Sequence, residues 1–225
     1  NAPESTWAQI NQLVSFFGRI NYIFDDTYLL TFTLRGDGSS RFSKDNRWGI
    51  FPAVALGWKI NNMKFLEPAQ GWLNDLKLRL GWGQTGQQEM DDYFPYISKY
   101  TLSYQNGFKY LNPDGSGVWI NPLYPSAYNP NLKWETTTTW NVGIDMGFLN
   151  NRISLAADWY KRDNHDLIGV INTQGIGGQV MKYGNVAGLK SSGVELTLST
   201  RNIETKNFSW STDFIYSHLK EEVTD

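Results

Sequence analysis

The chain has 225 residues, a formal net charge of -2 and no cysteine. Its 20 basic residues are balanced by 22 acidic ones, which supplies no basic field for nucleic acid. The missing cysteines remove disulfides, thiolate metal sites and thiol catalysis. No window approaches the roughly 18 consecutive apolar residues of a membrane-spanning helix, so a helical membrane protein is excluded. Aromatic residues at 15% and 21 glycines favour strands and turns, and we expect an all-β fold.

Alternating apolar residues predict four strands in the first part of the chain, at residues 14–24, 28–34, 50–60 and 76–83. Pro52 lies inside the third of them, a position normally found at an edge or a bulge. In the fourth, Lys77 and Arg79 alternate with leucines, which indicates that one face of this strand meets water.

The connections between these strands differ in length and composition. A short turn is expected at residues 25–27, and a polar loop with several glycines at residues 36–47. Residues 61–74 are expected to hold a helical turn packed against the end of the sheet. Residues 84–133 form the longest stretch without periodicity, and a connection of this length usually marks function or disorder.

The clearest pattern is a hairpin between Trp134 and Arg162. Trp140 and Phe148 bracket the apolar face of its first strand, and the turn at Asn150 and Asn151 suits the left-handed backbone of a tight hairpin. Eight positions along a tilted strand separate the two rings by roughly 20 Å along a membrane normal. That spacing is typical of two interfacial aromatic belts around an apolar band.

After the hairpin, residues 163–191 are expected to form a second long loop that contains the glycine-rich stretch 175–178. Two more strands follow, at residues 194–199 and 208–217, joined by a short turn at 202–207. The glycine-rich stretch is most simply a flexible part of that loop.

Connection lengths alternate along the chain. Those after the second, fourth and sixth strands are longer than most of the others, with residues 61–74 as the exception. This alternation predicts an antiparallel up-and-down transmembrane β-barrel of which the chain supplies about eight strands, with long extracellular loops. Two alternatives are a soluble, secreted β-sandwich that binds carbohydrate through surface aromatics, and a surface adhesin or structural barrel without transport.

Short motifs in a fixed order extend along nearly the whole chain. They are RGDGSSRF at 35–42, DNRWGIFP at 45–52, LKLR at 76–79, GQTGQ at 83–87, NPNLKWETT at 129–137, FLNNRI at 148–153, GNV at 184–186 and SGVEL at 192–196. With this series the chain resembles the SusC/RagA-like group of TonB-dependent outer-membrane transporters of Bacteroidetes.

The resemblance implies a bacterial outer-membrane protein in which residues 1–225 are part of a β-barrel domain. Barrels of this group close about 22 strands around a plug. The chain begins at Asn1 without an initiator methionine or signal peptide, so we expect a mature form or an excised segment that lacks the plug domain and the C-terminal strands.

The resemblance also implies function. Members of the group import oligosaccharides or peptides, with a SusD-like surface lipoprotein as a lid and the TonB complex as the source of energy. The TonB complex would act through parts not in this chain. Outer-membrane lipid is the other expected partner, nucleic acid is not one, and no cofactor is implied. The shared motifs do not separate a glycan substrate from a peptide.

Candidate ligand contacts lie in two regions. Aromatic residues of the long loop can stack on sugar rings or pack against a partner, and packing within the loop is the equally weighted alternative. They are Tyr93, Tyr96, Tyr100, Tyr104, Trp119 and Tyr124. The basic residues Lys77, Arg79 and Arg162, on the polar face of the predicted strands, are the second group.

No residue set indicates catalysis or a metal. Asp158 and Glu195 form a carboxylate pair on different strands, but charges lining a wet barrel explain them better than a glycosidase. Residues 114–117 lack the alternating carboxylates and the distal glutamate of a calcium loop, and His165 and His218 are isolated. We therefore expect no enzymatic activity, no catalytic residues and no metal ligands.

Overall fold

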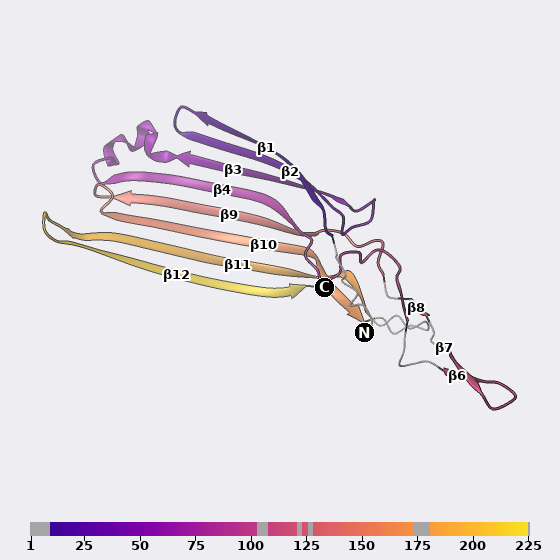
Figure 1. The fold of residues 1–225 in the computed structure, drawn as a ribbon. Helices are drawn as coiled ribbons and strands as arrows, with labels where there is room; N and C mark the ends of the chain where they lie inside the picture. The colour runs from indigo at the N-terminus through magenta and orange to yellow at the C-terminus, as the bar shows by residue number, and fades with distance from the viewer. Residues whose placement is uncertain (1–9, 103–107, 121–122, 126–127, 173–180, 225) are drawn as a thin grey trace.

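The chain folds into one broad, curved antiparallel sheet. The computed structural model describes residues 10–102, 108–120, 123–125, 128–172 and 181–224. Within them eight strands form the sheet, in the order β1-β2-β3-β4-β9-β10-β11-β12 (Figure 1). No helix in these residues is long and apolar enough to cross a membrane. The prediction of an all-β, up-and-down antiparallel arrangement of about eight strands is confirmed.

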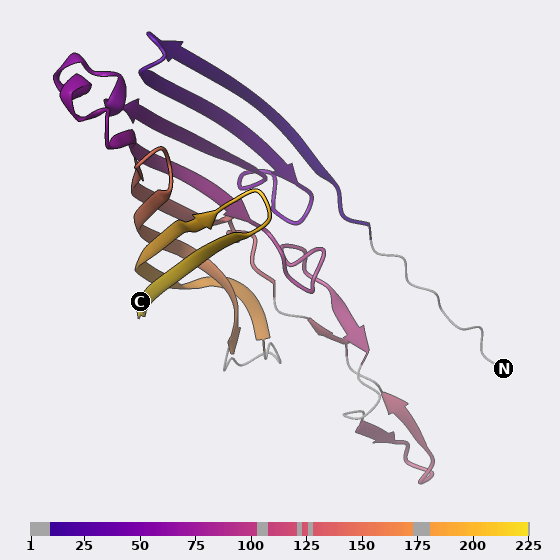
Figure 2. The ribbon, with the colours of Figure 1, turned by 90° about the vertical axis from the view of Figure 1, so that its left-hand side faces the viewer.

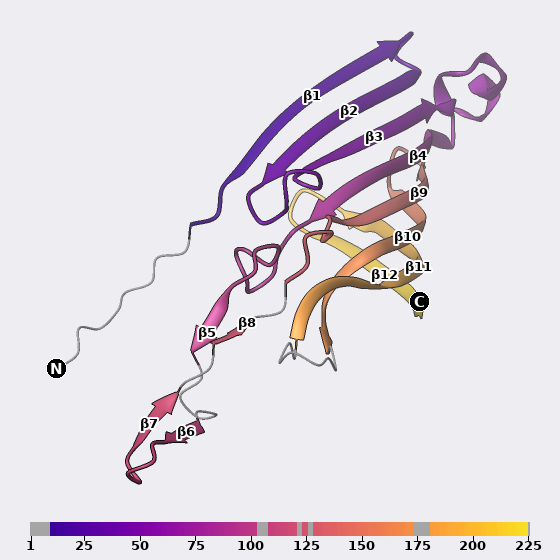
Figure 3. The ribbon, with the colours of Figure 1, turned by 90° about the vertical axis from the view of Figure 1, so that its right-hand side faces the viewer.

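The strands are long, and each pairs with the next strand of the sheet. Their bounds are β1 Leu13–Phe24, β2 Tyr28–Ser39, β3 Trp48–Lys59, β4 Leu73–Gln87, β9 Glu135–Phe148, β10 Ile153–Asn172, β11 Met181–Glu204 and β12 Ser209–Thr224. The sheet bends into a trough in the two side views, as a section of a barrel wall does (Figures 2 and 3). In the described residues β1 and β12 each pair with a single strand, so this section of wall is not closed.

The convex face of the wall is apolar and exposed. Side chains on alternate positions of neighbouring strands form rows across it, such as Trp82 beside Trp140 with ring centroids 6.1 Å apart. Trp140 keeps 52% of its surface exposed, and Phe16 and Phe214 keep even more. A sandwich would bury such a face between two sheets. The soluble β-sandwich alternative is therefore not supported.

Connections sort to the two ends of the wall as the sequence predicts. At one end, here called the turn end, lie the tight connections after β1, β9 and β11 and the segment that holds η1 (Ile60–Asn62) and η2 (Lys64–Ala69). The left-handed φ angles of Asn150 and Asn151, +57° and +58°, confirm the predicted hairpin turn. The expected helical turn is confirmed by η1 and η2. At the other end, the loop end, lie the connection after β2 and the long connection between β4 and β9 (Figure 1).

The prediction of a second long loop at residues 163–191 is wrong. β10 continues to Asn172 and β11 begins at Met181, and the two strands pair along this stretch. Register shifts between Asn164 and Ile168, where Asp166 has a φ of +61°, interrupt the pairing. A bulge adds an unpaired residue, so side chains beyond it point to the opposite face from the one that the alternation predicts. The two-residue period in the sequence is lost there, although the strands stay paired. The glycine-rich stretch 175–178 lies outside the described residues.

Two other expected loops are shorter than predicted. β2 extends through Ser39 into the stretch expected as a polar loop at 36–47, and β4 continues to Gln87. Beyond β4 the long connection contains two small ribbons, formed by β5 (Tyr100–Leu102) with β8 (Leu123–Pro125) and by β6 (Phe108–Leu111) with β7 (Gly117–Ile120). Strands of three or four residues are too short to leave a periodic pattern.

The structure explains how a proline is tolerated inside β3. Pairing between β3 and β4 begins at Ala53 and Gly83, so Pro52 is the first position at which β3 has no partner on β4. The stretch from Trp48 to Pro52 pairs only with β2, and it behaves as an edge, where proline is accepted.

The gap between β3 and β4 beyond Pro52 is filled by an apolar cluster. Phe42, Phe51, Leu132 and Trp134 form this loop core, and they are among the few buried apolar residues of the described chain. The ring of Trp134 lies 5.1 Å from that of Phe42 and 5.6 Å from that of Phe51. Its indole Nε1 donates a hydrogen bond of 3.1 Å to the carbonyl oxygen of Arg47. Three loop-end segments are thereby packed together.

Gly86 of β4 makes this packing possible. The Phe51 ring lies over its α-carbon, and a Cβ at position 86 would overlap ring atoms Cζ, Cε1 and Cε2. Phe51 is 6% exposed and held by Trp134, so the ring has little room to move. Glycine is therefore required at position 86 by a close approach between a side chain and the backbone.

Replacing Gly86 by alanine is expected to destabilise the wall by about 1–3 kcal/mol, the usual cost of overpacking. The matched control is Gly18→Ala on β1, because a Cβ there meets nothing within 4 Å. The measurement is the temperature at which the full-length barrel loses its compact mobility in SDS electrophoresis. Equal temperatures for the two variants would contradict the role given to the loop core.

Candidate functional site

A hollow at the loop end is the candidate binding site. It has a volume of about 610 Å³ and lies between the segment that follows β4 and the paired ends of β10 and β11. We call it the mouth pocket. Its lining is Arg41, Glu89, Met90, Asp91, Tyr93, Ile168, Gly169, Val170 and Tyr183. Met90, Ile168 and Tyr183 also pack against the loop core, so the pocket is built directly on that cluster.

Arg41 fixes the segment that forms one side of the mouth pocket. Its Nη1 donates hydrogen bonds to the carbonyl oxygens of Met90, at 2.7 Å, and Gln88, at 3.4 Å. Its guanidinium carbon lies 4.8 Å from the centre of the Tyr93 ring, a cation–π contact. The hydroxyl of Ser39 accepts a hydrogen bond from the Arg41 backbone N–H, at 3.1 Å. The RGDGSSRF motif thus holds Tyr93 in place.

The opposite side of the pocket is fixed by the bulge in β10. The carboxylate of Glu135 accepts hydrogen bonds from Asn164 Nδ2, at 2.9 Å, and from the Ile168 backbone N–H, at 3.2 Å. Asn185 Nδ2 donates to the carbonyl oxygens of Asp166, at 2.7 Å, and Lys133, at 3.0 Å. These contacts hold Ile168 at the pocket, and they come from the NPNLKWETT and GNV motifs.

The inner, concave face of the wall carries a cluster of paired charges. Arg79 of β4 donates two hydrogen bonds of 2.8 Å to Asp145 of β9 and one of 2.9 Å to Asp158 of β10. The guanidinium crosses the backbone of β9 at Gly143, where a Cβ would overlap both Arg79 and Asp158. One cation therefore ties three neighbouring strands.

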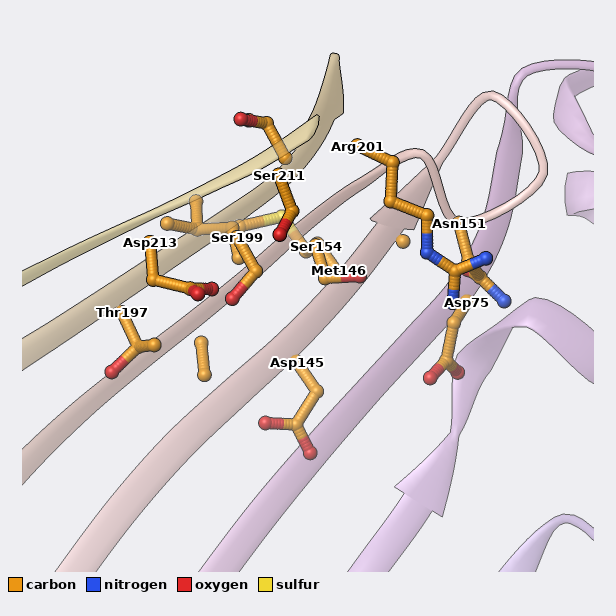
Figure 4. Close-up of a pocket in the computed structure, with 14 residues that line it drawn as sticks. Asp75, Asp145, Met146, Asn151, Ser154, Thr197, Ser199, Arg201, Ser211 and Asp213 are labelled. Carbon is orange, nitrogen blue, oxygen red and sulfur yellow. The ribbon is translucent and has the colours of Figure 1, made fainter. Parts of the chain in front are cut away.

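Below this ion cluster, toward the turn end, the inner face is hollowed and polar. A cavity of about 530 Å³ there is lined largely by acidic and hydroxyl side chains (Figure 4). Asp145, Asp213 and Ser199 are among them. A face of this kind requires contact with water or with other polar groups, as expected for the lumen side of a barrel.

Asp158 and Glu195 are direct cross-strand partners on β10 and β11. Asp158 is occupied by Arg79, at 2.9 Å, and lies 20% exposed, while Glu195 is exposed. A carboxylate that is paired with an arginine stabilises the wall and is poorly placed for acid–base chemistry. The arrangement supports the interpretation of these residues as lumen charges.

The two small ribbons project from the loop end as an arm (Figure 3). The ribbon of β6 and β7 exposes apolar side chains on both faces, with Tyr110 and Val118 on one and Leu111 and Trp119 on the other. Its turn is closed by Asp114, whose Oδ1 accepts hydrogen bonds from Ser116 Oγ, at 2.6 Å, and Ser116 N, at 2.9 Å. These bonds lower the pKa of the Asp114 carboxyl. The side chain therefore stabilises the turn of the ribbon.

The predicted contact residues fall in three separate places. Tyr93 lines the mouth pocket, and Tyr96 follows it, half-buried. Trp119, 66% exposed, lies on the arm, and Tyr100 is exposed in β5. Lys77 and Arg79 lie on the inner face, as does Arg162, whose guanidinium carbon lies 5.3 Å from the centre of the Tyr160 ring. Tyr104 and the Tyr124 side chain lie outside the described residues.

Sequence reasoning missed Arg41, Glu89, Met90 and Asp91 as neighbours of Tyr93. The signal for Arg41 is its place in the RGDGSSRF motif, but its contacts depend on a segment that lies more than 40 positions away in the sequence. Among the described residues there is no group of three or more histidine, cysteine, aspartate or glutamate side chains arranged to hold a metal ion.

A curved antiparallel wall with an apolar outer face, a polar inner face and sorted connections defines part of a transmembrane β-barrel. A family profile described as "TonB dependent receptor-like, beta-barrel" matches residues 2–224. The chain belongs to this family of outer-membrane proteins. The loop end is accordingly extracellular and the turn end periplasmic.

Comparison with individual proteins agrees with this assignment. The chain is 43% identical to the TonB-dependent receptor SusC of Bacteroides thetaiotaomicron over 98% of its length and 22% of SusC. It is 35% identical to the TonB-dependent receptor P26 of Formosa agariphila, covering 95% of this chain and 21% of that protein. The chain therefore spans about a fifth of the length of the relatives it matches.

Solved structures give the same result. The structure of the RagAB peptide transporter matches with a TM-score of 0.79 at 30% identity, over 95% of this chain and 22% of that chain. The siderophore receptor PirA of Pseudomonas aeruginosa shares the fold, with a TM-score of 0.58 at 17% identity over 95% of this chain and 35% of that one.

Removing the cation of the inner-face cluster is expected to destabilise the barrel. Arg79→Gln leaves Asp145 and Asp158 facing each other without a partner, at a cost of about 1–2 kcal/mol. Lys77→Gln is the matched control, because Lys77 lies on the same strand and face and joins none of the ion pairs among the described residues. Thermal unfolding of the full-length protein in detergent measures both. A loss as large for Lys77→Gln as for Arg79→Gln would refute the role of the cluster.

Proposed function

We propose that this chain is a wall segment of an outer-membrane TonB-dependent active transporter that imports oligosaccharides or peptides. Residues 1–225 would belong entirely to the barrel domain, and the remaining strands and a plug would come from the rest of a longer protein. The observation that carries the proposal is the mouth pocket, a built hollow that lies at the extracellular end of the barrel wall. Substrate would bind at this end and then pass through the lumen.

The chemistry of the mouth pocket suits recognition of a polar, uncharged polymer. Tyr93 supplies an aromatic surface, while Arg41, Glu89 and Asp91 supply hydrogen-bond donors and acceptors. Sugar hydroxyls and peptide amides both match such a set. RagAB, one of the relatives named above, is a peptide transporter, and the resemblance to the SusC/RagA-like group implies oligosaccharides or peptides. We carry both classes forward for this chain.

Transport requires no covalent chemistry in this segment. Two acidic side chains of the inner face, Asp145 and Asp158, are paired with Arg79 at 2.8 Å and 2.9 Å. Their contribution would be to keep the lumen polar while holding three strands together. We therefore propose a binding and translocation role without enzymatic activity, in which energy reaches the barrel from the TonB complex through parts outside this chain.

The arm is our candidate contact for a SusD-like surface lipoprotein that acts as a lid. An isolated two-stranded ribbon is marginally stable in water, and this one exposes Tyr110, Leu111, Val118 and Trp119 at its extracellular position. Apolar side chains on both faces of a ribbon need a covering partner. A lid protein resting on the mouth of the barrel would supply that cover.

The pocket is tested with Tyr93→Ala in the full-length transporter. Loss of the ring is expected to weaken substrate binding about tenfold, which corresponds to about 1.4 kcal/mol. Calorimetry with a panel of oligosaccharides and oligopeptides measures the affinity and identifies the substrate class. Tyr216→Ala, a truncation of an exposed tyrosine on β12, is the control and should bind as the wild type does. Unchanged affinity of Tyr93→Ala for every ligand that binds would exclude the pocket.

The arm is tested with Trp119→Asp, which places a charge in the centre of its apolar surface. We expect the lipoprotein to co-purify with the wild-type transporter and to be lost from the variant. Lys109→Asp, the cross-strand partner of Trp119, is the control for a charge change at the same level of the ribbon. Equal recovery of the lipoprotein with Trp119→Asp would show that the lid contacts another part of the barrel.

A further inference from the structure

An apolar groove crosses the outer face of the wall near its periplasmic end. It has a volume of about 240 Å³ and extends over β1 to β4. Its floor is a cross-strand row in which Tyr22 pairs with Leu30, Leu30 with Leu56, and Leu56 with Leu80. These four side chains are each partly exposed, and almost no polar surface lines the groove.

Aromatic side chains lie in the rows on both sides of this leucine row. On the periplasmic side the row begins with Phe24, Tyr28 and Trp58, and the rings of Tyr28 and Trp58 stack 6.3 Å apart at an angle of 13°. On the other side, Phe32 pairs with Val54 and Val54 with Trp82. Tyr28 and Trp58 line the groove and Phe32, Val54 and Trp82 do not, so the groove lies between the periplasmic aromatic row and the leucine row.

The position of the groove decides what occupies it. The convex face of an outer-membrane barrel contacts hydrocarbon, and rows rich in tyrosine and tryptophan mark the level of the lipid headgroups. The leucine row lies one step from the aromatic row toward the membrane interior, where acyl chains begin. An apolar groove at this depth fits a linear hydrocarbon chain and offers nothing to a polar ligand.

The segment that contacts the periplasmic side of the groove carries a cation. The hydroxyl of Tyr28 contacts the sulfur of Met63 at 3.9 Å, which places the start of η2 beside the aromatic row. Lys64, the first residue of η2, is exposed, and none of the ion pairs among the described residues involves it. A lysine at the headgroup level pairs favourably with a lipid phosphate.

We propose that this groove is a phospholipid site, which holds one acyl chain on the leucine row and the phosphate close to Lys64. The lipid would come from the periplasmic leaflet. The inference rests on the family and the orientation of the wall, and it is independent of what the transporter imports.

The site is tested by native mass spectrometry of the full-length transporter, reconstituted in phosphatidylglycerol and phosphatidylethanolamine and released by detergent. Leu56→Trp and Leu80→Trp fill the groove from two different strands and are expected to lose the adduct of one phospholipid. Leu34→Trp is the matched control, because Leu34 is 44% exposed on β2 and lies outside the groove. It should keep the adduct.

Lys64→Gln tests the proposed phosphate contact separately. Lys64 lies on an exposed connection, so the substitution leaves the packing of the wall unchanged. Its retention of phosphatidylglycerol is expected to fall relative to the wild type in the same detergent series. Folded electrophoretic mobility of each variant is checked first. Equal phospholipid retention in the wild type, both groove variants and Lys64→Gln would overturn the site. A wild-type dimer that the groove variants convert to a monomer would overturn it too, because a second copy of the chain would then occupy the groove.

Discussion

The structure depends on the pairing of backbone groups between neighbouring strands. In hydrocarbon no water replaces a missing partner, and each unpaired N–H or C=O costs several kcal/mol. Antiparallel ladders that join β1 to β12 through the whole sheet meet this demand with short connections at one end. In a paired strand, successive side chains point alternately to lipid and to the lumen. The apolar residues therefore form the outer surface of the wall. The loop core, a cluster of buried apolar residues, lies where the ladder opens between β3 and β4.

This arrangement connects stability to function at the extracellular mouth. The loop core joins segments that are far apart in sequence, as the hydrogen bond between Trp134 and the Arg47 carbonyl, 87 positions apart, illustrates. The same packing presents Arg41 and Tyr93 to the mouth pocket. On the inner face, Arg79 pairs with two carboxylates and so joins three strands while the lumen side stays polar. The motifs on which the family resemblance rests include residues that build the mouth, among them Arg41 and Glu135.

Much of the wall could be predicted from the sequence because side-chain alternation follows directly from the strand period. The hairpin around Asn150 is an example, and it is confirmed. The sorting of connections is confirmed only in part, because paired strand replaces most of the long loop expected at residues 163–191. The extensions of β10 and β11 were missed because the bulge at Asp166 switches faces and removes the period. Phe42 and Leu132 were missed because they lie in segments without periodicity, and their burial depends on contacts between distant parts of the chain. Ligand contacts depend on the same long-range packing. The sequence could therefore suggest which residues contact a ligand, but not which of them lie together in one pocket.

The most direct test of the account is the sidedness of the wall in intact cells. This chain has no cysteine. Single cysteines are placed by Lys44→Cys in the connection after β2 and by Lys206→Cys in the turn after β11, both at exposed lysines, in a full-length protein from which any other cysteine has been removed. A maleimide that does not cross the outer membrane is applied to cells that carry the full-length protein. The account predicts labelling at position 44 in intact cells and at position 206 only after the membrane is opened. Equal labelling at both positions in intact cells would contradict a wall that spans the outer membrane.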